Sequence, residues 1–537
     1  MKKYIFVTGG VVSSLGKGIA SASIGSIIEG SGLKVNFIKL DPYLNMDPGT
    51  MNPFEHGEVY VTDDGNETDL DLGHYERYVN VRMSKKNNMT SGKIFNNVLK
   101  KERQGDYLGQ TVQIIPHLTD EIQSSVANIE GDIIIVEIGG TVGDIESLPF
   151  LEAIRQMRLK LGLENTFFIH LTLVPYIASS QEIKTKPTQH SVKELRSIGI
   201  QPDMIICRCS HTLSKAQKEK IALFTNVTNK HILSLEDVNC VYKVPNLLLE
   251  QSIDQLIFNH FKINDKSIDL SSWQLYLQQF DKPKFNLKIG IVGKYSSYVD
   301  AYKSLTEALN HASVKNQAQL EIVYINSEMP IDELTAAIKL VNGLVIPGGF
   351  GERGIEGKIQ AIQIAREQSI PLLGICLGMQ LMVVEYLRHV KNIADANSTE
   401  FDKDTSNPVI ATIDEWGSDE QKKQFEKVFD GKMQLGLAEI QIKQSSQTSQ
   451  IYAQSSIYER HRHRYGFNPN YLEHLASDGL KAVGFNPQLK SLIEVVELET
   501  HPWFIGCQYH PEFLSTPRKP HPLFDDLIKC LIEKLGD

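Results

Sequence analysis

Apolar runs of strand length alternate with helix-like stretches through the first half of the chain. The runs lie at residues 4–8, 35–40, 133–137, 167–173 and 203–207. Residues 19–29 have the spacing of a helix, and Gly30 and Gly32 follow where a left-handed helix end is expected. Strand, helix and strand in succession predict a parallel sheet covered by helices, beginning with one βαβ unit.

The same alternation returns in the second half. Strands are expected at 287–292, 320–324, 343–346, 372–375 and 503–508, with helices near 301–310 and 377–388. The interval between the halves is polar and contains Pro283. We therefore expect a first domain at 1–265, a linker at 266–286 and a second parallel-sheet domain at 287–537. A segment rich in Ser and Gln at 444–456 is expected to be an exposed loop or turn.

Composition agrees with two large domains and excludes several partners. The chain has 537 residues, 41% hydrophobic and 22% charged, whereas a single core stops growing at roughly 250 to 300 residues. A net charge of -10 argues against duplex nucleic acid as the main partner. The apolar run at 4–7 is too short for a signal-peptide core, and no run is long enough to span a membrane. We expect a cytoplasmic protein with no membrane partner.

The six cysteines are scattered through the chain without the spacing of a disulfide framework or a zinc site. Cys207 and Cys209 alternate on an expected strand and are interpreted as packing residues. A reducing compartment suits all six.

Cys376 has the setting of a nucleophile. An apolar strand at 372–375 runs into a helix through a turn with Gly374 and Gly378 two residues to either side of the cysteine. The helix N-terminus favours a thiolate, and the backbone N–H of Leu377 would face a developing oxyanion. Gly349, in the glycine-rich turn after the strand at 343–346, is the expected second donor.

A base and an orienting acid follow the last expected strand. His510 would accept the thiol proton, and Glu512 would fix the imidazole tautomer and stabilise its charged form. Taken alone, each of these residues has an ordinary structural interpretation. Together with the glycine-flanked cysteine they predict a Cys-His-Glu triad.

These motifs resemble the class I, triad-type glutamine amidotransferases, which release ammonia from glutamine through a glutamyl thioester. The resemblance covers roughly residues 287–537 and implies a set of glutamine-binding residues: Gly349, Leu377, Gly378, Met379, Gln380, Glu400 and Arg464. Glu400 can pair with the substrate ammonium and Arg464 with its carboxylate. Without the resemblance, the His-Arg run at 461–464 would be read as a solvated basic face.

A glycine-rich segment at 8–19 follows the first strand and opens the first helix, so its amides and Lys17 are placed to hold phosphates. Its spacing is one residue longer than that of the common P-loop, and Gly18 stands where a magnesium-binding Ser or Thr is usual. A tight turn without phosphate is the alternative. Magnesium would need carboxylates from elsewhere, and Asp71 and Glu137 are the candidates.

The phosphate loop, residues 39–50, 56–59, 137–146 and 184–189, with the amidotransferase motifs in the same order, resemble the CTP synthase family over essentially the whole chain. The resemblance implies an α/β fold with two parallel-sheet domains, the first P-loop-like and dethiobiotin-synthetase-like. It also implies that ATP phosphorylates O4 of UTP and that ammonia from the Cys376 site displaces the phosphate to give CTP.

The same resemblance assigns roles to residues of the first domain. Those expected to contact ATP are Ser14, Leu15, Gly16, Lys17, Gly18, Ile19, Asp71, Glu236, Asp237 and Val238. Those expected to contact UTP or CTP are Ser13, Asp144, Ile145, Glu146, Lys184, Thr185, Lys186, Pro187, Thr188, Gln189 and Lys220. Lys17 and Lys39 would act in phosphoryl transfer, and Asp71 and Glu137 would bind Mg²⁺. The alternative interpretation of Lys184 and Lys186 is that they are ordinary surface lysines.

Family members are typically homotetramers, dimers of dimers, inhibited by CTP and activated by GTP, and filament formation is left open. Gln181 and Gly466 depart from the expected glycine and acidic residue. Two rival functions remain: another amidotransferase-synthetase fusion such as a cobyrinic acid amidase, and a P-loop scaffold ATPase with an inert glutaminase-like domain.

Overall fold

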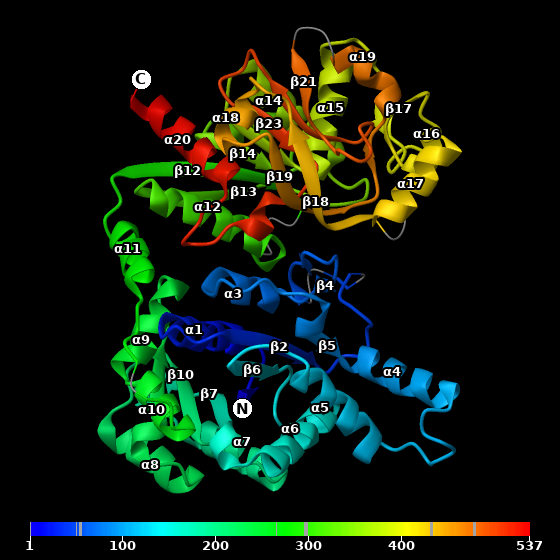
Figure 1. Cartoon of the computed structure of the whole chain (residues 1–537). Helices are drawn as coiled ribbons and strands as arrows, with labels where there is room; N and C mark the ends of the chain where they lie inside the picture. The colour runs from blue at the N-terminus through cyan, green and yellow to red at the C-terminus, as the bar shows by residue number, and fades with distance from the viewer. Residues whose placement is uncertain are drawn as a thin grey trace. The chain divides into compact units, whose positions relative to one another are not determined.

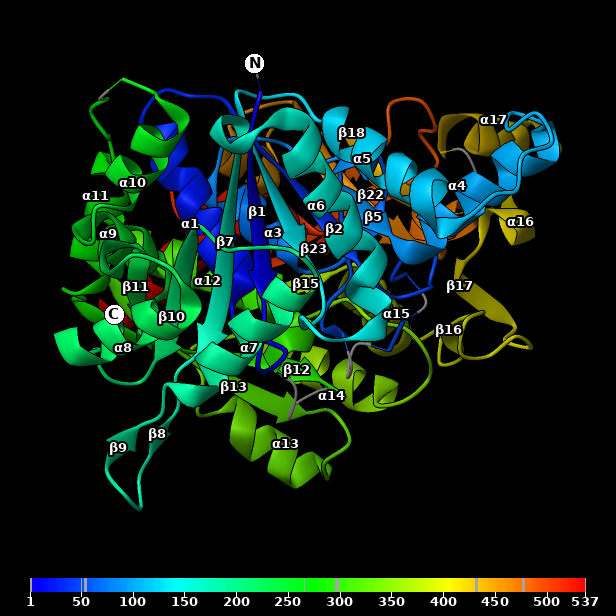
Figure 2. The same cartoon turned by 90° about the horizontal axis from the view of Figure 1, so that it is seen from below.

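The computed structural model describes residues 2–49, 51–52, 56–264, 266–294, 299–429, 433–475 and 479–536. The chain forms two compact units, one of residues 1–50 and 68–274 and the other of residues 51–67 and 275–537. Figure 1 and Figure 2 show the strands and helices of both. None of the described helices is long and apolar enough to cross a membrane.

The first unit is built on a seven-stranded sheet in which every pairing is parallel. In spatial order its strands are β11 (Ile232–Glu236), β10 (Met204–Cys209), β7 (Thr166–Leu173), β1 (Lys3–Gly9), β6 (Ile133–Ile138), β2 (Val35–Asp41) and β5 (Asn88–Thr90). Its central strands are apolar and buried at nearly every position because helices cover both faces (Figure 1).

The helices of this unit are α1 (Lys17–Gly30), α3 (Asp71–Tyr78), α4 (Ser91–Gln104), α5 (Thr119–Ala127), α6 (Leu148–Leu161), α7 (Lys186–Ser197), α8 (Lys215–Thr225), α9 (Val244–Glu250), α10 (Ile253–Phe261) and the start of α11 (Ser271–Phe280). Alternate residues of β1 pack on opposite faces, and Tyr4 and Phe6 join the core made with α5 and α6. A short hairpin of β8 (Tyr176–Ile177) and β9 (Glu182–Ile183) extends from the ends of β7 and β10 (Figure 2).

The second unit contains a nine-stranded sheet. Its spatial order is β13 (Ala318–Asn326), β12 (Phe285–Gly293), β14 (Gly343–Ile346), β15 (Leu372–Ile375), β23 (Phe504–Cys507), β22 (Ile493–Leu498), β21 (Leu480–Phe485), β18 (Gln434–Ile442) and β19 (Ser456–His463). The pairings from β13 to β23 are parallel, and those from β23 to β19 are antiparallel. The catalytic candidates lie at the carboxyl ends of β14, β15 and β23, all in the parallel part.

The helices of this unit are α12 (Lys303–Lys315), α13 (Ile331–Ile338), α14 (Ile355–Glu367), α15 (Leu377–His389), α16 (Ile413–Trp416), α17 (Asp419–Phe429), α18 (Gln447–Tyr452), α19 (Leu472–Leu475) and α20 (Pro522–Gly536). A small sheet holds β16 (Ala396–Ser398), β17 (Asn407–Ala411) and β20 (Gly466–Phe467).

The predicted α/β fold is confirmed, and the expected strands and helices are present with ends shifted by at most a few residues. The first sheet is parallel as expected, whereas the second is parallel only from β13 to β23 and antiparallel beyond. Gly32 has φ +80°, the left-handed conformation expected there, while Gly30 is the last residue of α1. Cys207 and Cys209 are buried, and all six cysteines are unpaired.

The expected loop at 444–456 was wrong in part, because α18 occupies residues 447–452. Ser446 caps this helix by accepting a hydrogen bond from the Ser449 amide, and the buried Glu497 carboxylate accepts from the amides of Gln447 and Thr448. The sequence around 444–456 could not predict this helix, because the carboxylate that caps it comes from Glu497, which is distant in the chain.

The two units divide between residues 274 and 275, inside α11, within the interval expected to be a linker. The segment at 51–67 belongs to the second unit although it lies far from it in sequence. It contains β3 (Tyr60–Val61), which pairs with β4 (Glu67–Thr68). Tyr60 donates a hydrogen bond to the Phe513 carbonyl and stacks edge-on against its ring. The expected domains were continuous stretches of chain, so they did not include this inserted segment. The functions assigned to the ranges 1–265 and 287–537 stay a prediction.

Candidate active sites

Cys376 stands between β15 and α15 with φ +52° and ψ -104°. A non-glycine residue with this backbone is strained, which is the hallmark of a nucleophile placed on a sharp strand-to-helix turn. The side chain is 5% exposed, and its backbone N–H donates to the Cys507 carbonyl of β23 over 2.7 Å. The strain is therefore maintained by the sheet on one side and the helix on the other.

The two glycines flanking Cys376 are required by close packing. A Cβ on Gly374 would lie 2.3 Å from the Met382 sulfur, and one on Gly378 would lie 2.1 Å from the Ile346 carbonyl oxygen. Neither position can hold a side chain without moving α15 away from β14 and β15. The sequence motif thus reports how tightly the helix packs behind the nucleophile.

His510 and Glu512 stand together next to Cys376, as predicted. The His510 Nδ1 and Glu512 Oε1 atoms are 2.7 Å apart, and His510 also hydrogen bonds to Cys376. Burial alone would lower the pKa of His510, but Glu512 and Cys376 outweigh it and raise that pKa to about 10. The arrangement favours a protonated His510 imidazole beside the Cys376 sulfur, with its Nδ1 fixed by Glu512.

The loop at 347–351 passes directly over the triad. A Cβ on Gly348 would lie 2.9 Å from His510 Cε1 and 3.6 Å from Cys376 Cβ, so this glycine allows the close approach. Gly349, the expected oxyanion donor, has its nearest side-chain neighbours in Leu377 and Lys358. The loop is therefore in place to supply a backbone N–H opposite that of Leu377.

Gln508 was missed by the sequence reasoning. It is 1% exposed on the approach to His510, and its Nε2 lies 3.7 Å from the Cys376 sulfur. Its Oε1 accepts a hydrogen bond from Gln380 Nε2 over 3.2 Å, and Gln380 also donates to the Tyr465 carbonyl. The side-chain amide of Gln508 thus connects Gln380, a predicted glutamine-binding residue, to Cys376 through hydrogen bonds.

Glu400 and Arg464 lie on the same side of the unit as the glycine-rich loop. Glu400 Oε1 accepts a hydrogen bond from the Gly351 amide over 2.8 Å. Burial raises the pKa of Glu400, and Lys294 and Arg464 oppose that rise. Arg464 is exposed and, with Tyr465, lines a cavity of about 340 Å³ bounded by α16 and α17. Met379, Gly378 and Leu377 are buried in the first turn of α15.

Two histidines and an acid form a buried support behind Cys376. His461 Nε2 and Glu494 Oε2 are 3.0 Å apart, and Gln434 donates to the other oxygen of Glu494. With His463 they bring three potential ligand atoms within 4.8 Å of one another. The Arg462 carbonyl between the two histidines is 3.9 Å from the Cys376 sulfur. We interpret the group as a hydrogen-bonded cluster that fixes β19 beside Cys376.

The phosphate loop of the first unit has an unusual backbone. Val11, Ser14 and Gly16 all have positive φ, at 82°, 54° and 92°. The first two cost conformational energy, which is typical of loops shaped for a ligand. Arg208 donates to the carbonyls of Ser14 and Leu15 and pairs with Asp237, a residue expected in the adenine site. Sequence reasoning missed Arg208 because nothing near it in the chain marks it.

Gly18, the departure from the common P-loop, is explained by Asp71. A Cβ on Gly18 would lie 2.1 Å from Asp71 Oδ1, so the space that a Ser or Thr would occupy holds this carboxylate. Glycine at position 18 and the Asp71 carboxylate from α3 therefore depend on each other, because the carboxylate fits only when position 18 has no side chain. Ile19 lies in the first turn of α1, and Ser13 is exposed in the loop.

Lys39 joins the two predicted metal ligands. Its ammonium contacts Asp71, lies 3.0 Å from Glu137 Oε1 and lies 3.8 Å from Asp41. Burial opposes the charged form, but Asp71 and Glu137 prevail and hold the pKa of Lys39 well above its usual value. Tyr75 donates to the other oxygen of Glu137 over 2.5 Å. Asp41 was not predicted as a site residue.

The acids outnumber the lysines here. Burial, and then Asp71, raise the pKa of Asp69 to about 8, and burial raises the pKa of Asp41. Lys17 donates to the Gly140 carbonyl over 2.9 Å, and burial lowers the pKa of Lys17. Four carboxylates, those of Asp41, Asp69, Asp71 and Glu137, thus lie near two lysines, so acidic side chains are in excess here.

The residues expected to bind the pyrimidine nucleotide lie in two places. Lys184 pairs with Glu182 on the β8–β9 hairpin, and the field of Lys220 reaches Glu182. Thr185, Lys186, Pro187, Thr188 and Gln189 follow at the start of α7, with Gln189 donating to the Thr185 hydroxyl. Asp144 accepts from the Thr141 amide, with Ile145 exposed and Glu146 beside it. Within the described residues, no hydrogen bond or ion pair joins these two groups.

Three other expected residues complete the comparison. Glu236 is the last residue of β11, and Asp237 follows it. Glu236 accepts a hydrogen bond from Thr212. Val238 comes next in the chain. Thr50, the last residue of the motif at 39–50, lies outside the described residues.

The two departures have structural settings. Gln181 has φ +50°, a conformation that glycine adopts without strain, which accounts for the glycine expected there. Gly466 in β20 has open space where a Cβ would lie, so an acidic side chain would be accommodated.

Comparison with known proteins gives matches over both halves. The family model for the CTP synthase N-terminus matches residues 3–263, and that for class-I glutamine amidotransferase matches residues 297–530. A CTP synthase of Hydrogenobaculum sp. (strain Y04AAS1) is 55% identical over 529 residues, covering 98% of this chain and 97% of the relative. The solved glutaminase domain of Trypanosoma brucei CTPS with bound acivicin is 35% identical, with a TM-score of 0.42, and the match covers 46% of this chain and 94% of that one.

Proposed function

The chain belongs to the CTP synthase family, and from that premise we propose which of its residues carry each step of the amination of UTP. The overall reaction converts UTP to CTP with nitrogen from glutamine and energy from ATP. The observation that carries the proposal is the combination in one chain of the Cys376 triad with a phosphate loop closed by Asp71.

Cys376 hydrolyses glutamine. Its sulfur attacks the side-chain carbonyl carbon, and His510 gives a proton to the departing amine, so ammonia leaves and a glutamyl thioester remains. Water then attacks the thioester, with His510 as base, and releases glutamate and the thiol. The N–H groups of Leu377 and Gly349 would hold the oxyanion in both steps. The 2.7 Å contact with Glu512 supports this role because it fixes the His510 tautomer.

Glutamine is held at both of its charged ends. Glu400 pairs with its α-ammonium and Arg464 with its carboxylate, while Gly378, Met379 and Gln380 form the wall beside the side-chain amide. The closeness of Glu400 to the glycine-rich loop, through the Gly351 amide, supports this placement.

ATP activates UTP in the first unit. The γ-phosphoryl group passes from ATP to O4 of the uracil ring, giving ADP and 4-phosphorylated UTP, and ammonia then displaces inorganic phosphate from C4 to give CTP. The amides of residues 14–19 would hold the ATP phosphates. Lys17 and Lys39 would neutralise charge on the transferring group.

The acid cluster suits Mg²⁺. Asp71 and Glu137 offer hard oxygen ligands beside the phosphate loop, and with Asp41 and Asp69 the acids here outnumber the lysines. When bound, the ion would neutralise the β- and γ-phosphates of ATP. Lys39 holds the two carboxylates in position, and Tyr75 orients Glu137.

Nucleotide recognition is divided between loops. We assign the adenine site to Glu236, Asp237 and Val238, next to Arg208. UTP or CTP would be bound by Ser13 and by the residues at 144–146, 184–189 and 220. Supporting this, Lys186 begins α7, and the charges of Lys184 and Lys220 both act on Glu182 in the hairpin before it.

Three further properties rest on the family resemblance. We propose GTP as an activator, CTP as an inhibitor, and a cytoplasmic homotetramer built as a dimer of dimers. Size-exclusion chromatography with light scattering, in the presence and absence of UTP and ATP, measures the last of these.

Substitution of Lys17 tests the synthetase assignment. We expect Lys17→Ala to abolish CTP formation from glutamine and from free ammonia alike, because the phosphoryl group loses its charge partner. A spectroscopic assay for CTP with UTP, ATP and each nitrogen source measures this. Lys160→Ala, which removes an exposed lysine of the same unit, is the control. Ammonia-dependent turnover by Lys17→Ala would remove Lys17 from phosphoryl transfer, and absence of CTP from the unaltered protein would favour a carboxylate-amidating fusion.

A further inference from the structure

A buried lysine lies beneath the loop that faces Cys376. Lys358 is on α14 and is 2% exposed. Its Nζ is 3.8 Å from the point that a Cβ of Gly349 would occupy, and Gly348, the neighbouring residue, is the one whose Cβ would contact Cys376. Among the described residues, no hydrogen bond or ion pair joins the Lys358 ammonium. A buried ammonium without a partner is costly, so its position calls for a counter-charge.

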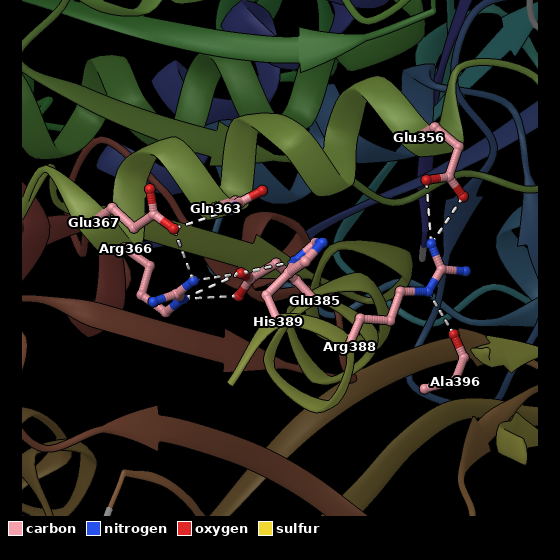
Figure 3. Close-up of polar contacts among 8 residues, drawn as sticks. All are labelled: Glu356, Gln363, Arg366, Glu367, Glu385, Arg388, His389 and Ala396. Carbon is pink, nitrogen blue, oxygen red and sulfur yellow. Dashed lines mark hydrogen bonds and ion pairs between the residues drawn. The ribbon is translucent and has the colours of Figure 1, made fainter. Parts of the chain in front are cut away.

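The placement of Lys358 relative to Cys376 is fixed by the packing of α14 on α15. Figure 3 shows the polar contacts between these two helices. Arg366 of α14 makes a two-pronged ion pair with Glu385 of α15, at 2.8 to 3.1 Å, and Glu385 is fully buried. Glu356 of α14 pairs with Arg388 of α15, which also donates to the Ala396 carbonyl. Since α15 begins directly after Cys376, this network sets where Lys358 lies.

We propose that Lys358 is a positioning residue for glutamine hydrolysis, whose ammonium stabilises the negative charge that forms on the Cys376 sulfur and on the oxyanion beside Gly349. The inference rests on the proposed role of Cys376 as nucleophile. It deepens that role by naming a source of positive charge outside the triad.

The surrounding charges agree with this role. Burial, followed by repulsion from Lys294, lowers the pKa of Lys358 to about 8, and Cys376 is the one group found to oppose that shift. The acids of neighbouring elements are engaged elsewhere: Glu385 with Arg366, Glu328 after β13 with Arg353, and Glu400 with the Gly351 amide. On α13, Asp332 and Glu333 are exposed. The thiolate is therefore the natural counter-charge for Lys358.

The sign of the pH dependence follows from this pairing. Below about pH 8 Lys358 is protonated and favours the thiolate, and above that pH the stabilisation is lost. His510, with a pKa of about 10, stays mostly protonated near pH 8, where the fall is expected to begin. A fall of glutaminase kcat/KM that begins near pH 8 is thus the signature of Lys358.

The test compares the full-length protein with Lys358→Met, Lys358→Arg and the surface control Lys481→Met. Rates of Cys376 alkylation by iodoacetamide and of glutamine hydrolysis are measured from pH 6 to 10. Lys358→Met should slow Cys376 alkylation at pH 7 about tenfold, lower kcat at pH 7 about tenfold and leave KM nearly unchanged. Lys358→Arg should restore most of the rate without the fall near pH 8.

Several outcomes would overturn the inference. An unchanged rate of Cys376 alkylation in Lys358→Met is one. A parallel loss of ammonia-dependent CTP synthesis in Lys358→Met would show that this variant is misfolded. In that case the unaltered protein decides, because a kcat/KM profile that stays level to pH 9 contradicts the role of Lys358. If Cys376→Ala still hydrolyses glutamine, the proposed function fails instead.

Discussion

At the scale of single residues, the chemistry of the second unit depends on a backbone conformation that few residues adopt. Cys376 keeps φ +52° because Gly374 and Gly378 let α15 approach β14 and β15. In the first unit, Gly18 makes room for Asp71 in the same way. Both sites thus use a missing side chain to bring a reactive group or a carboxylate close to a helix N-terminus.

The Glu512 carboxylate should control the charge of His510. We predict that Glu512→Gln lowers the pKa of His510 from about 10 and reduces glutamine hydrolysis at least about a hundredfold. A histidine with a raised pKa stabilises the fold fully below pH 6.5, and this contribution is lost as the pH rises through about 10. The stability difference between the two proteins should therefore shrink between pH 6.5 and 10.

Titration of His510 by NMR and chemical denaturation at several pH values measure these effects. Glu512→Asp, which keeps the charge on a shorter side chain, is the conservative control. An unshifted His510 pKa in Glu512→Gln would contradict the triad as described.

Residues that a motif contains were predictable, and residues that reach a site through tertiary packing were not. Cys376, His510 and Glu512 come together because each follows a strand of one parallel sheet, which the apolar pattern already showed. Lys358, Gln508 and Arg208 carry no local signal. Their side chains are directed by α14, by the segment that follows β23 and by β10, whose placement is decided by packing.

At the scale of elements, the pairing of α14 with α15 should connect stability to glutaminase activity. We predict that Arg366→Met destabilises the second unit by about 3 kcal/mol, because it leaves the buried Glu385 carboxylate with His389 in place of its two-pronged arginine partner. The double variant Arg366→Met/Glu385→Met should recover most of this loss, since it removes both charges.

A double-mutant cycle in urea measures the coupling between Arg366 and Glu385. Glutamine-dependent kcat should fall with Arg366→Met while ammonia-dependent synthesis stays near its original rate. Additive effects of the two substitutions would show that the ion pair does not brace the helices.

Element prediction was accurate where a strand or helix is specified by its own residues. The bounds of β14 and β15 agree with the apolar runs at 343–346 and 372–375. The antiparallel strands from β22 to β19 and the helix α18 were not foreseen as a continuation of the sheet. Their partners are distant in sequence, and alternation alone does not give strand order.

At the scale of the whole molecule, a segment from the first half of the chain completes the second unit. Arg460 of β19 is fully buried and pairs with Asp63 over 2.6 Å, while Tyr60 lies 2.8 Å from the guanidinium. Arg462 pairs with Glu67, and its carbonyl is next to the Cys376 sulfur. The segment at 51–67 therefore supports the strand that passes beside the nucleophile.

Removing the Asp63 charge should weaken this support. We predict that Asp63→Asn destabilises the second unit by about 2 kcal/mol and slows glutamine hydrolysis more than ammonia-dependent synthesis, because Arg460 keeps a buried charge with a weaker partner. Asp64→Asn, on the adjacent residue, is the matched control. Equal loss of both activities, or no loss of stability by calorimetry, would contradict the role of this segment.

The central claim is that Cys376 supplies ammonia to a separate synthetase site in the same chain. Cys376→Ala tests it most directly, with CTP formation from UTP and ATP measured separately with glutamine and with ammonium chloride. We predict that synthesis from glutamine disappears while synthesis from ammonia continues at about the original rate. Loss of synthesis from both nitrogen sources, or its persistence with glutamine, would contradict the account.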